Sequence, residues 1–251
     1  MAMPITVVTV SIKTILDDVS QYLQYEIDEG TLSVEIPNAM RQRTASPKQN
    51  APAPVADNSV SQELTKIAQV VSECRNCRLH QTRTNTVPGQ GSVSPEILFV
   101  GEAPGEDEDL QGLAFVGRAG QLLTKMIEAM GFSRDQVFIA NILKCRPPAN
   151  RPPEEDEMQA CLPYLKAQIA LLKPKVMVGL GATAVKGLLG TTVGITKLRG
   201  KWHSYEGIDF MPTFHPSYLL RYAPAKKEAW DDLQEVLRRI GKEPPPRKRE
   251  P

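Results

Sequence analysis

The 251-residue sequence contains few residues of several kinds, and each scarcity excludes a class of protein. It has only four cysteines, three histidines and 6% aromatic residues, and its 30 lysines and arginines nearly balance 29 acidic residues. A net charge of +1 gives no general attraction to nucleic acid, so such binding would depend on local basic patches. No apolar run is long enough to span a bilayer, which excludes a helical membrane protein.

The first twelve residues, MAMPITVVTVSI, contain no lysine or arginine and no small-residue cleavage site of a secretory signal. We therefore expect a cytoplasmic protein, in the cytosol or nucleoid, that does not bind membranes. In that reducing compartment, four cysteines are more typical of thiolate ligands around a metal than of disulfides.

Composition divides the chain into four parts. Residues 1–37 combine β-branched and apolar helical patterns with an acidic excess, and they predict a small appended element of unknown role. Residues 38–59 are rich in Pro, Ala, Ser, Gln and Asn, which is typical of a flexible linker. The main domain is predicted over 60–241, and a disordered basic tail over 242–251.

Short apolar runs alternate with amphipathic helical patterns from residue 96 onward. Buried strands are predicted over 96–101, 137–141, 174–180 and 209–214. Helices are predicted over 120–130, 154–172, 182–189 and 226–240. This alternation predicts an α/β fold in which a mostly parallel central sheet is flanked by helices on both faces, a three-layer α/β/α arrangement.

Polar residues follow three of the four predicted strands. The first strand leads into Gly101-Glu-Ala-Pro-Gly-Glu-Asp-Glu-Asp109, the second ends at Asn141, and the fourth precedes His215. Ligands of parallel sheets bind beyond the carboxyl ends of the strands, so these groups predict one polar recognition site. A glycine-flanked segment places Phe115 where it would add an aromatic face.

All four cysteines are consistent with one metal site. Cys74 and Cys77 form a Cys-x-x-Cys pair ahead of the first strand, whereas Cys145 and Cys161 follow the second strand. Four thiolates bind either an iron–sulfur cluster or zinc. The wide separation of the second pair is unlike most structural zinc sites, but both metals stay open on spacing alone.

Five segments together resemble the iron–sulfur, family 4 uracil-DNA glycosylases. They are GEAPGEDED, GLAFVG, NILKCRPP, ITKLRGKW and FHPSYLLR, in family order within residues 60–240. The resemblance implies the uracil-DNA glycosylase fold and hydrolysis of the N-glycosidic bond of uracil in DNA, which leaves an abasic site and starts base excision repair. It also implies a structural 4Fe-4S cluster held by Cys74, Cys77, Cys145 and Cys161, since hydrolysis transfers no electrons.

The resemblance further implies roles within the site. Phe115 would stack on a uracil flipped out of the duplex, and Asn141 would present a donor and an acceptor to its Watson–Crick edge. His215 would donate to uracil O2 as negative charge gathers there. Ala103 stands where better-known families carry a water-orienting Asp or Asn, so we expect Glu102 to position the water or stabilise the sugar cation.

Some of these residues also have a purely structural interpretation. Phe115 is also compatible with ordinary core packing, and Asn141 with a helix N-cap. The acidic run from Glu106 to Asp109 is expected to be solvated at its outer members, while Glu108 is predicted to exclude thymine by a steric clash with its methyl group. The backbone amides of residues 102 and 103 are expected to contact a uracil carbonyl.

DNA contacts are predicted around the same crevice. Phosphate contacts are assigned to Arg118, Arg199, Lys201, Ser217 and Arg221, and the wedge that fills the gap left by the flipped base to Leu219 or Leu220. We expect a monomer that acts on uracil-containing DNA, with residues 1–59 and the C-terminal tail as candidate contacts for a repair or replication partner. Two other functions stay open: an iron–sulfur module that binds nucleic acid without turnover, and a glycosylase for another deaminated base.

Overall fold

The computed structural model describes residues 56–244, so the predicted element over 1–37 lies outside the described residues. Helix α3, Ala56–Glu73, begins four residues before the predicted start of the main domain. At the other end, Lys242 does not belong to a disordered tail. Its amide donates to the Leu237 carbonyl at 2.9 Å, its ammonium pairs with Glu96, and it lies over the Phe132 ring.

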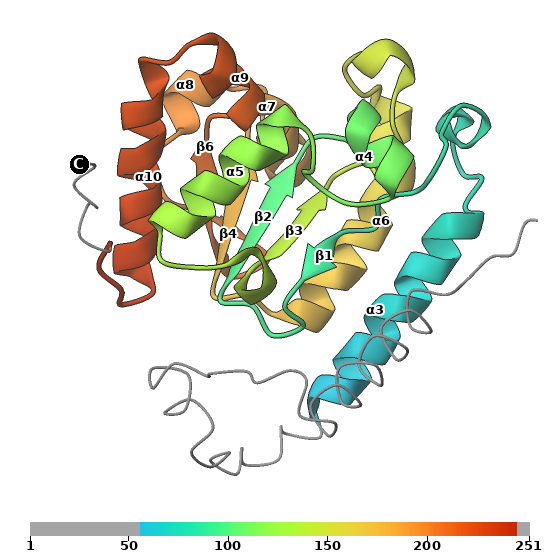
Figure 1. Ribbon diagram of the computed structural model, residues 1–251, viewed down its shortest axis with the longest axis horizontal. Helices are drawn as coiled ribbons and strands as arrows, with labels where there is room; N and C mark the ends of the chain where they lie inside the picture. Colours follow the sequence, from blue (N-terminus) through green and yellow to red (C-terminus); the bar gives the residue numbers. More distant parts are fainter. Residues whose placement is uncertain (1–55, 245–251) are drawn as a thin grey trace, which may run out of the picture. The chain divides into compact units, whose positions relative to one another are not determined.

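A six-stranded sheet with the order β1-β3-β2-β4-β6-β5 forms the centre of the domain (Figure 1). Its four inner strands are parallel: β2 Ile97–Gly101, β3 Phe138–Asn141, β4 Val176–Leu180 and β6 Ile208–Thr213. These are the four predicted strands, with ends that differ by one or two residues. The antiparallel edge strands β1, Gln90–Gly91, and β5, His203–Tyr205, are too short to leave a periodic signal in the sequence.

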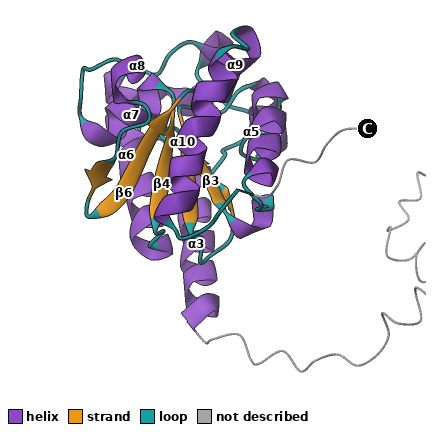
Figure 2. Ribbon diagram, turned by 90° about the vertical axis from the view of Figure 1, so that its left-hand side faces the viewer, coloured by secondary structure: helices purple, strands orange, loops and turns teal. Residues whose placement is uncertain are grey.

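Helices cover both faces of the sheet because alternate strand residues enter two separate cores (Figure 2). Leu98 and Val100 pack with α6 and α7, whereas Ile97 and Phe99 pack with α5 and α10. The bounds of these helices are α5 Arg118–Ala129, α6 Glu155–Leu172, α7 Ala182–Leu189 and α10 Ala225–Arg239. The predicted three-layer α/β/α fold is confirmed, and α3 adds an outer helix that packs along α6.

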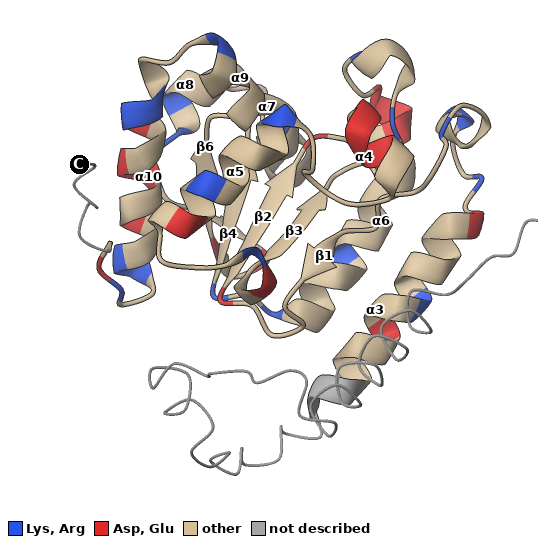
Figure 3. Cartoon of the chain, in the orientation of Figure 1, with Lys and Arg blue, Asp and Glu red and all other residues tan. Residues whose placement is uncertain are grey.

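Shorter helical segments connect the layers. They are η1 Arg78–Gln81, α4 Glu106–Gln111, η2 Arg134–Gln136, η3 Pro148–Asn150, α8 Ile195–Leu198 and α9 Pro216–Arg221. The acidic run forms helix α4, which the sequence analysis did not predict, and Figure 3 shows the acidic residues gathered on it. Carboxylates favour the first turn of a helix because they complement its positive end. No helix in the described part of the chain is long and apolar enough to cross a membrane.

Candidate active site

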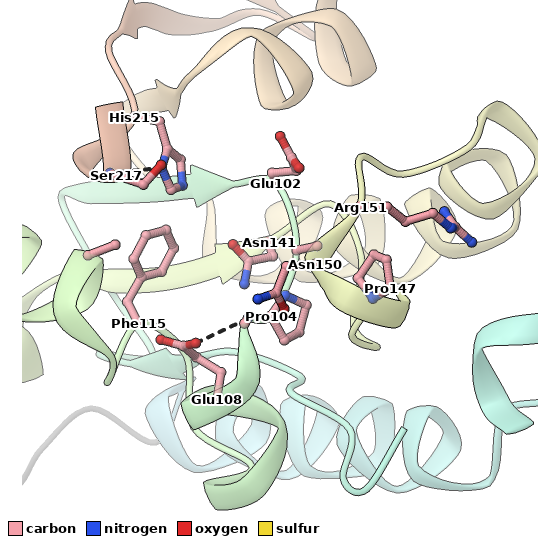
Figure 4. Close-up of a pocket in the computed structure, with 13 residues that line it drawn as sticks. Glu102, Pro104, Glu108, Phe115, Asn141, Pro147, Asn150, Arg151, His215 and Ser217 are labelled. Carbon is pink, nitrogen blue, oxygen red and sulfur yellow. Dashed lines mark hydrogen bonds between the residues drawn. The ribbon is translucent and has the colours of Figure 1, made fainter. Parts of the chain in front are cut away.

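One pocket lies at the carboxyl ends of β2, β3 and β6, where the topology places the polar strand exits. Its volume is about 280 Å³, and Figure 4 shows its lining side chains. The predicted residues that line it are Glu102, Ala103, Glu108, Phe115, Asn141, His215 and Ser217. Sequence reasoning missed the other lining residues, which are Pro104, Gly105, Ala119, Pro147, Asn150 and Arg151. Most of these lie in the segments GEAPG and CRPPANR, close to predicted site residues. Extending the site along these two segments would have identified them.

Asn141 presents a buried polar atom to this pocket. Its side chain is 1% exposed, and its Oδ1 has no hydrogen-bond partner among the described residues. An unpaired buried acceptor costs about 1–3 kcal/mol, and a donor that enters the pocket and binds it would remove that cost. The Lys144 ammonium holds the Asn141 carbonyl at 3.0 Å. The N-cap alternative is wrong, because the next helical segment begins only at Pro148.

A glycine allows Asn141 and Phe115 to share this end of the sheet. A Cβ on Gly101 would lie 2.4 Å from Asn141 Oδ1 and 2.5 Å from Phe115 Cζ. Real Cβ atoms do not approach other atoms so closely, so a larger residue at 101 would displace both side chains. The missing side chain at the end of β2 therefore leaves room for both Asn141 and Phe115.

Phe115 is both a core residue and a pocket residue. It is 6% exposed and packs with the α5 and α10 core, yet it also lines the pocket, with its ring centroid 5.8 Å from that of His215. Its φ of 52° is in the left-handed region, which costs a residue other than glycine about 1–3 kcal/mol. Such a conformation persists only where neighbouring contacts enforce it.

Glu108 supplies one of those contacts. Its carboxylate accepts hydrogen bonds from the amides of Gly105 at 3.1 Å, Val116 at 2.8 Å and Gly117 at 2.9 Å. It therefore fixes the segment next to Phe115, and its exclusion of thymine stays a prediction. Solvation of the acidic run is wrong for Asp109, which is 3% exposed and accepts from the amides of residues 84 and 85.

His215 is held as a neutral imidazole with a defined tautomer. It caps the N-terminus of α9, and its Nδ1 accepts the Ser217 amide proton at 3.1 Å, with Ser217 Oγ at 2.8 Å. Because Nδ1 is an acceptor, the ring proton of the neutral form is on Nε2. Burial lowers the pKa of His215 to about 4, and the nearby Arg221 cation adds to this effect. The ring is thus an uncharged donor at neutral pH.

This depressed pKa predicts a pH-dependent stability. The unfolded chain takes up a proton on His215 near its ordinary pKa of about 6.5, whereas the folded chain resists it to about 4. The stabilisation is therefore complete above pH 6.5 and is lost as pH falls towards 4. We expect His215→Asn to lose less stability than the wild type between pH 7 and pH 5, by on the order of 1–2 kcal/mol in urea unfolding. Equal losses in both proteins would contradict the assigned environment.

Glu102 follows β2 directly and keeps its carboxylate available. Its backbone carbonyl accepts the Leu143 amide at 3.0 Å, which fixes the main chain. Within residues 56–244, no hydrogen bond or ion pair engages its side chain, which lines the pocket in a half-buried position. A carboxylate in this state is able to bind a water molecule or face a developing positive charge.

The predicted DNA-contact residues differ in how far their side chains are exposed. Arg118, Lys201 and Arg221 are exposed, and Ser217 is half-buried at the pocket. Leu219 is 1% exposed and packs in a small cluster at the start of α10, so its assignment as a wedge is wrong. The alternative residue, Leu220, is 41% exposed.

The guanidinium of Arg199, a predicted phosphate contact, has structural partners within the protein. Its Nε donates to Asp232 at 3.0 Å, a second nitrogen donates to the Glu228 carbonyl at 2.6 Å, and the cation lies 5.3 Å from the Phe214 ring centroid. Asp232 also accepts from Thr213 at 2.6 Å. This network ties α10 to the end of β6, two residues before His215.

The four cysteines line a second, small cavity between η1, the exit of β3 and α6. Hydrogen bonds reach two of the sulfurs, from Arg83 to Cys145 at 3.1 Å and from the Lys144 amide to Cys161 at 3.2 Å. Burial raises the pKa of the Cys161 thiol to about 12, and it also raises the pKa of Cys77 and Cys145. A metal that binds these sulfurs would displace their protons.

The spacing leaves an iron–sulfur cluster and zinc open, and these two groups need different ligand geometries. No three His, Cys, Asp or Glu side chains of the described residues form a group that could hold a single metal ion. A zinc ion needs its four ligands close together, whereas a polynuclear cluster fills the space between them with its own atoms. The four cysteines around one cavity fit a site with four thiolate ligands.

Comparison with known proteins agrees with this geometry. The Uracil DNA glycosylase superfamily matches residues 88–234. The chain is 48% identical to the type-4 uracil-DNA glycosylase of Sulfurisphaera tokodaii over 182 residues, 69% of this chain and 83% of the relative. The Thermotoga maritima enzyme of the same name is 49% identical over 62% of this chain and 82% of its own length. That of Saccharolobus solfataricus is 42% identical over 72% and 88%. The chain therefore belongs to the uracil DNA glycosylase superfamily and, within it, to the type-4 uracil-DNA glycosylases.

Proposed function

We propose that this protein removes uracil from DNA by hydrolysing the N-glycosidic bond, which leaves an abasic site and starts base excision repair. The observation that carries the proposal is the buried, unpaired Oδ1 of Asn141 in a pocket that also contains Glu102, Phe115 and His215. None of the described residues that line the pocket is a lysine, so the site offers no amine for strand cleavage through a Schiff base.

Base selection rests on the polar pattern of uracil. Asn141 Oδ1 accepts the N3–H of the flipped base while the same amide donates to O4. Cytosine presents an acceptor at N3 and a donor at C4, so it reverses both interactions and leaves buried groups unpaired. Phe115 stacks on the ring, and Glu108 stays the predicted barrier to thymine's methyl group.

Two side chains act on the breaking bond. As the N1–C1′ bond breaks, its electron pair moves into the uracil ring and negative charge gathers on O2. The Nε2–H of neutral His215 stabilises that charge more in the transition state than in the ground state. Glu102 holds the water whose oxygen bonds to C1′, accepts its proton, and faces the positive charge that develops on the sugar.

DNA binding draws on exposed cations. Exposed Arg118, Lys201 and Arg221 neutralise phosphates, and Ser217 stays a predicted phosphate contact although its amide and hydroxyl face His215 Nδ1. Exposed Leu220, in place of Leu219, enters the gap left by the flipped base. We expect the protein to act on uracil-containing DNA as a monomer.

Cys74, Cys77, Cys145 and Cys161 would hold a 4Fe-4S cluster. When bound, the cluster supplies no step of the hydrolysis and serves as a structural link between η1, the chain after β3 and α6. We expect purified protein to be brown and to contain about four iron and four sulfide per chain, by metal and sulfide analysis. Cys161→Ala should lose the colour and melt at a lower temperature. One zinc per chain and no sulfide would contradict this composition.

A panel of bases tests the proposed function against the two alternatives. Labelled duplexes containing uracil, hypoxanthine or xanthine opposite a common partner are incubated with the protein, and abasic sites are revealed by alkali. We expect abasic sites at uracil and an intact strand before alkali. Excision of another base but not uracil would favour a different glycosylase, and DNA binding without excision would favour a binding module. The relatives' shared name does not favour either alternative.

A further inference from the structure

The conformation of Phe115 requires contacts from more than one side. With φ at 52°, Phe115 connects α4 to α5 in a strained left-handed turn, and its ring would relax out of the pocket if that turn opened. Glu108 binds the amides of Val116 and Gly117, which fixes the segment on the C-terminal side of Phe115. The carbonyls of the same segment need a separate partner.

Arg134 is that partner. One guanidinium nitrogen donates to the Phe115 carbonyl at 3.1 Å and to Thr124 Oγ1 at 3.0 Å, and another donates to the Ala114 carbonyl at 2.7 Å. The planar fork of arginine matches two adjacent carbonyls in a way that a lysine ammonium does not. Gly120 lets α5 approach this turn, since a Cβ there would lie 1.9 Å from the Phe115 carbonyl oxygen.

Arg134 belongs to η2 and is not among the residues that line the pocket. Burial disfavours its charged form and lowers its pKa, so its half-buried position carries a cost that the carbonyl contacts offset. We infer that Arg134 is a positioning residue for uracil excision, which together with Glu108 clamps the turn that presents the Phe115 ring to the base. The inference rests on the proposed function for its effect on activity, but not for its effect on Phe115.

A double-mutant cycle tests whether Arg134 acts through Phe115. Wild type, Arg134→Met, Phe115→Ala and the double variant are compared by single-turnover release of uracil from a U·G duplex. We expect Arg134→Met to be about 10–30-fold slower than the wild type, and the double variant to be within about threefold of Phe115→Ala. Arg134→Lys should recover part of the loss. Arg238→Met, which changes an exposed arginine paired with Glu235 on α10, is the matched control and should retain full activity.

Additive effects of the two substitutions would overturn the inference, because they would mean that Arg134 acts on stability or elsewhere in the site. If Arg134→Met does not fold, Thr124→Val removes a single anchor of the guanidinium and should give a smaller loss that also vanishes without Phe115.

A spectroscopic measurement separates this inference from the proposed function. The chain has six phenylalanines, so fluorine NMR of protein labelled with fluorophenylalanine gives few signals, and Phe115→Leu identifies the one from position 115. Arg134→Lys and Arg134→Met should shift or broaden that signal and leave the others in place, whether or not uracil is released. An unchanged Phe115 signal would overturn the inference even in an active enzyme. Absence of uracil release by the wild type, with the signal perturbed, would overturn only the proposed function.

Discussion

Replacing Asn141 by alanine is expected to slow uracil release by about 10³-fold, the largest single effect of any substitution in the pocket. The change removes both the acceptor for N3–H and the donor for O4, and it leaves those uracil groups unpaired in a closed site. The buried Oδ1 has no hydrogen-bond partner among the described residues, so we expect its removal to cost the fold little stability. Single-turnover release of uracil from a U·G duplex, with enzyme in excess, measures the chemical step.

Stability and a matched polar substitution serve as controls for that result. Gln159→Ala removes an exposed amide from α6 and should stay within about twofold of the wild type. The Asn141→Ala protein should retain its unfolding midpoint to within a small shift. A rate within tenfold of the wild type would show that base recognition does not depend on this amide.

Replacement of Glu102 should give the second largest effect, a slowing of about 10²–10³-fold for Glu102→Ala. Glu102→Gln keeps the size of the side chain and its ability to hold a water, but it removes the negative charge. Since Glu102 is proposed both to accept the water's proton and to face the sugar cation, we expect Gln to be about as slow as Ala, whereas partial activity in Gln would mean that the side chain only holds the water. Both variants are compared with the wild type by the same release assay between pH 6 and pH 8.

The control for Glu102 is a carboxylate close by in the sequence. Glu106→Gln changes an exposed residue at the start of α4, whose nearest cation is Arg146 at 3.7 Å, and should keep nearly full activity. Full activity in Glu102→Ala would remove Glu102 from the mechanism and leave the position of the water to the backbone of the same loop.

The sequence predicted the inner sheet and the pocket well because both depend on local patterns. Apolar runs of four to six residues marked β2, β3, β4 and β6, and the polar residues that follow parallel strands necessarily meet at one edge. The edge strands β1 and β5 were missed since two or three residues leave no periodicity. Helix α4 was not predicted because an acidic run gives no apolar periodicity that would distinguish a helix from a loop.

Residues whose surroundings the sequence did not predict contact other segments of the chain. Leu219 lies two residues after the pocket residue Ser217, but it packs with Ala225 and Ala229 of α10, and Arg199 pairs with Asp232 on the same helix. Asp109 meets backbone amides more than twenty residues earlier in the chain. The sequence around each of these residues does not show whether its side chain is exposed or engaged by a distant partner. Only the fold shows which side chains are free to contact DNA.

The most direct test of the central claim is single-turnover release of free uracil from a U·G duplex by the full-length, aerobically purified protein, with Asn141→Ala and Glu102→Ala measured in parallel. A uracil-DNA glycosylase with its active site in this pocket predicts stoichiometric release by the wild type, an abasic strand that breaks only with alkali, and release slowed at least a hundredfold by both substitutions. No uracil from a brown, folded protein that binds the duplex, or equal rates for all three proteins, would contradict it.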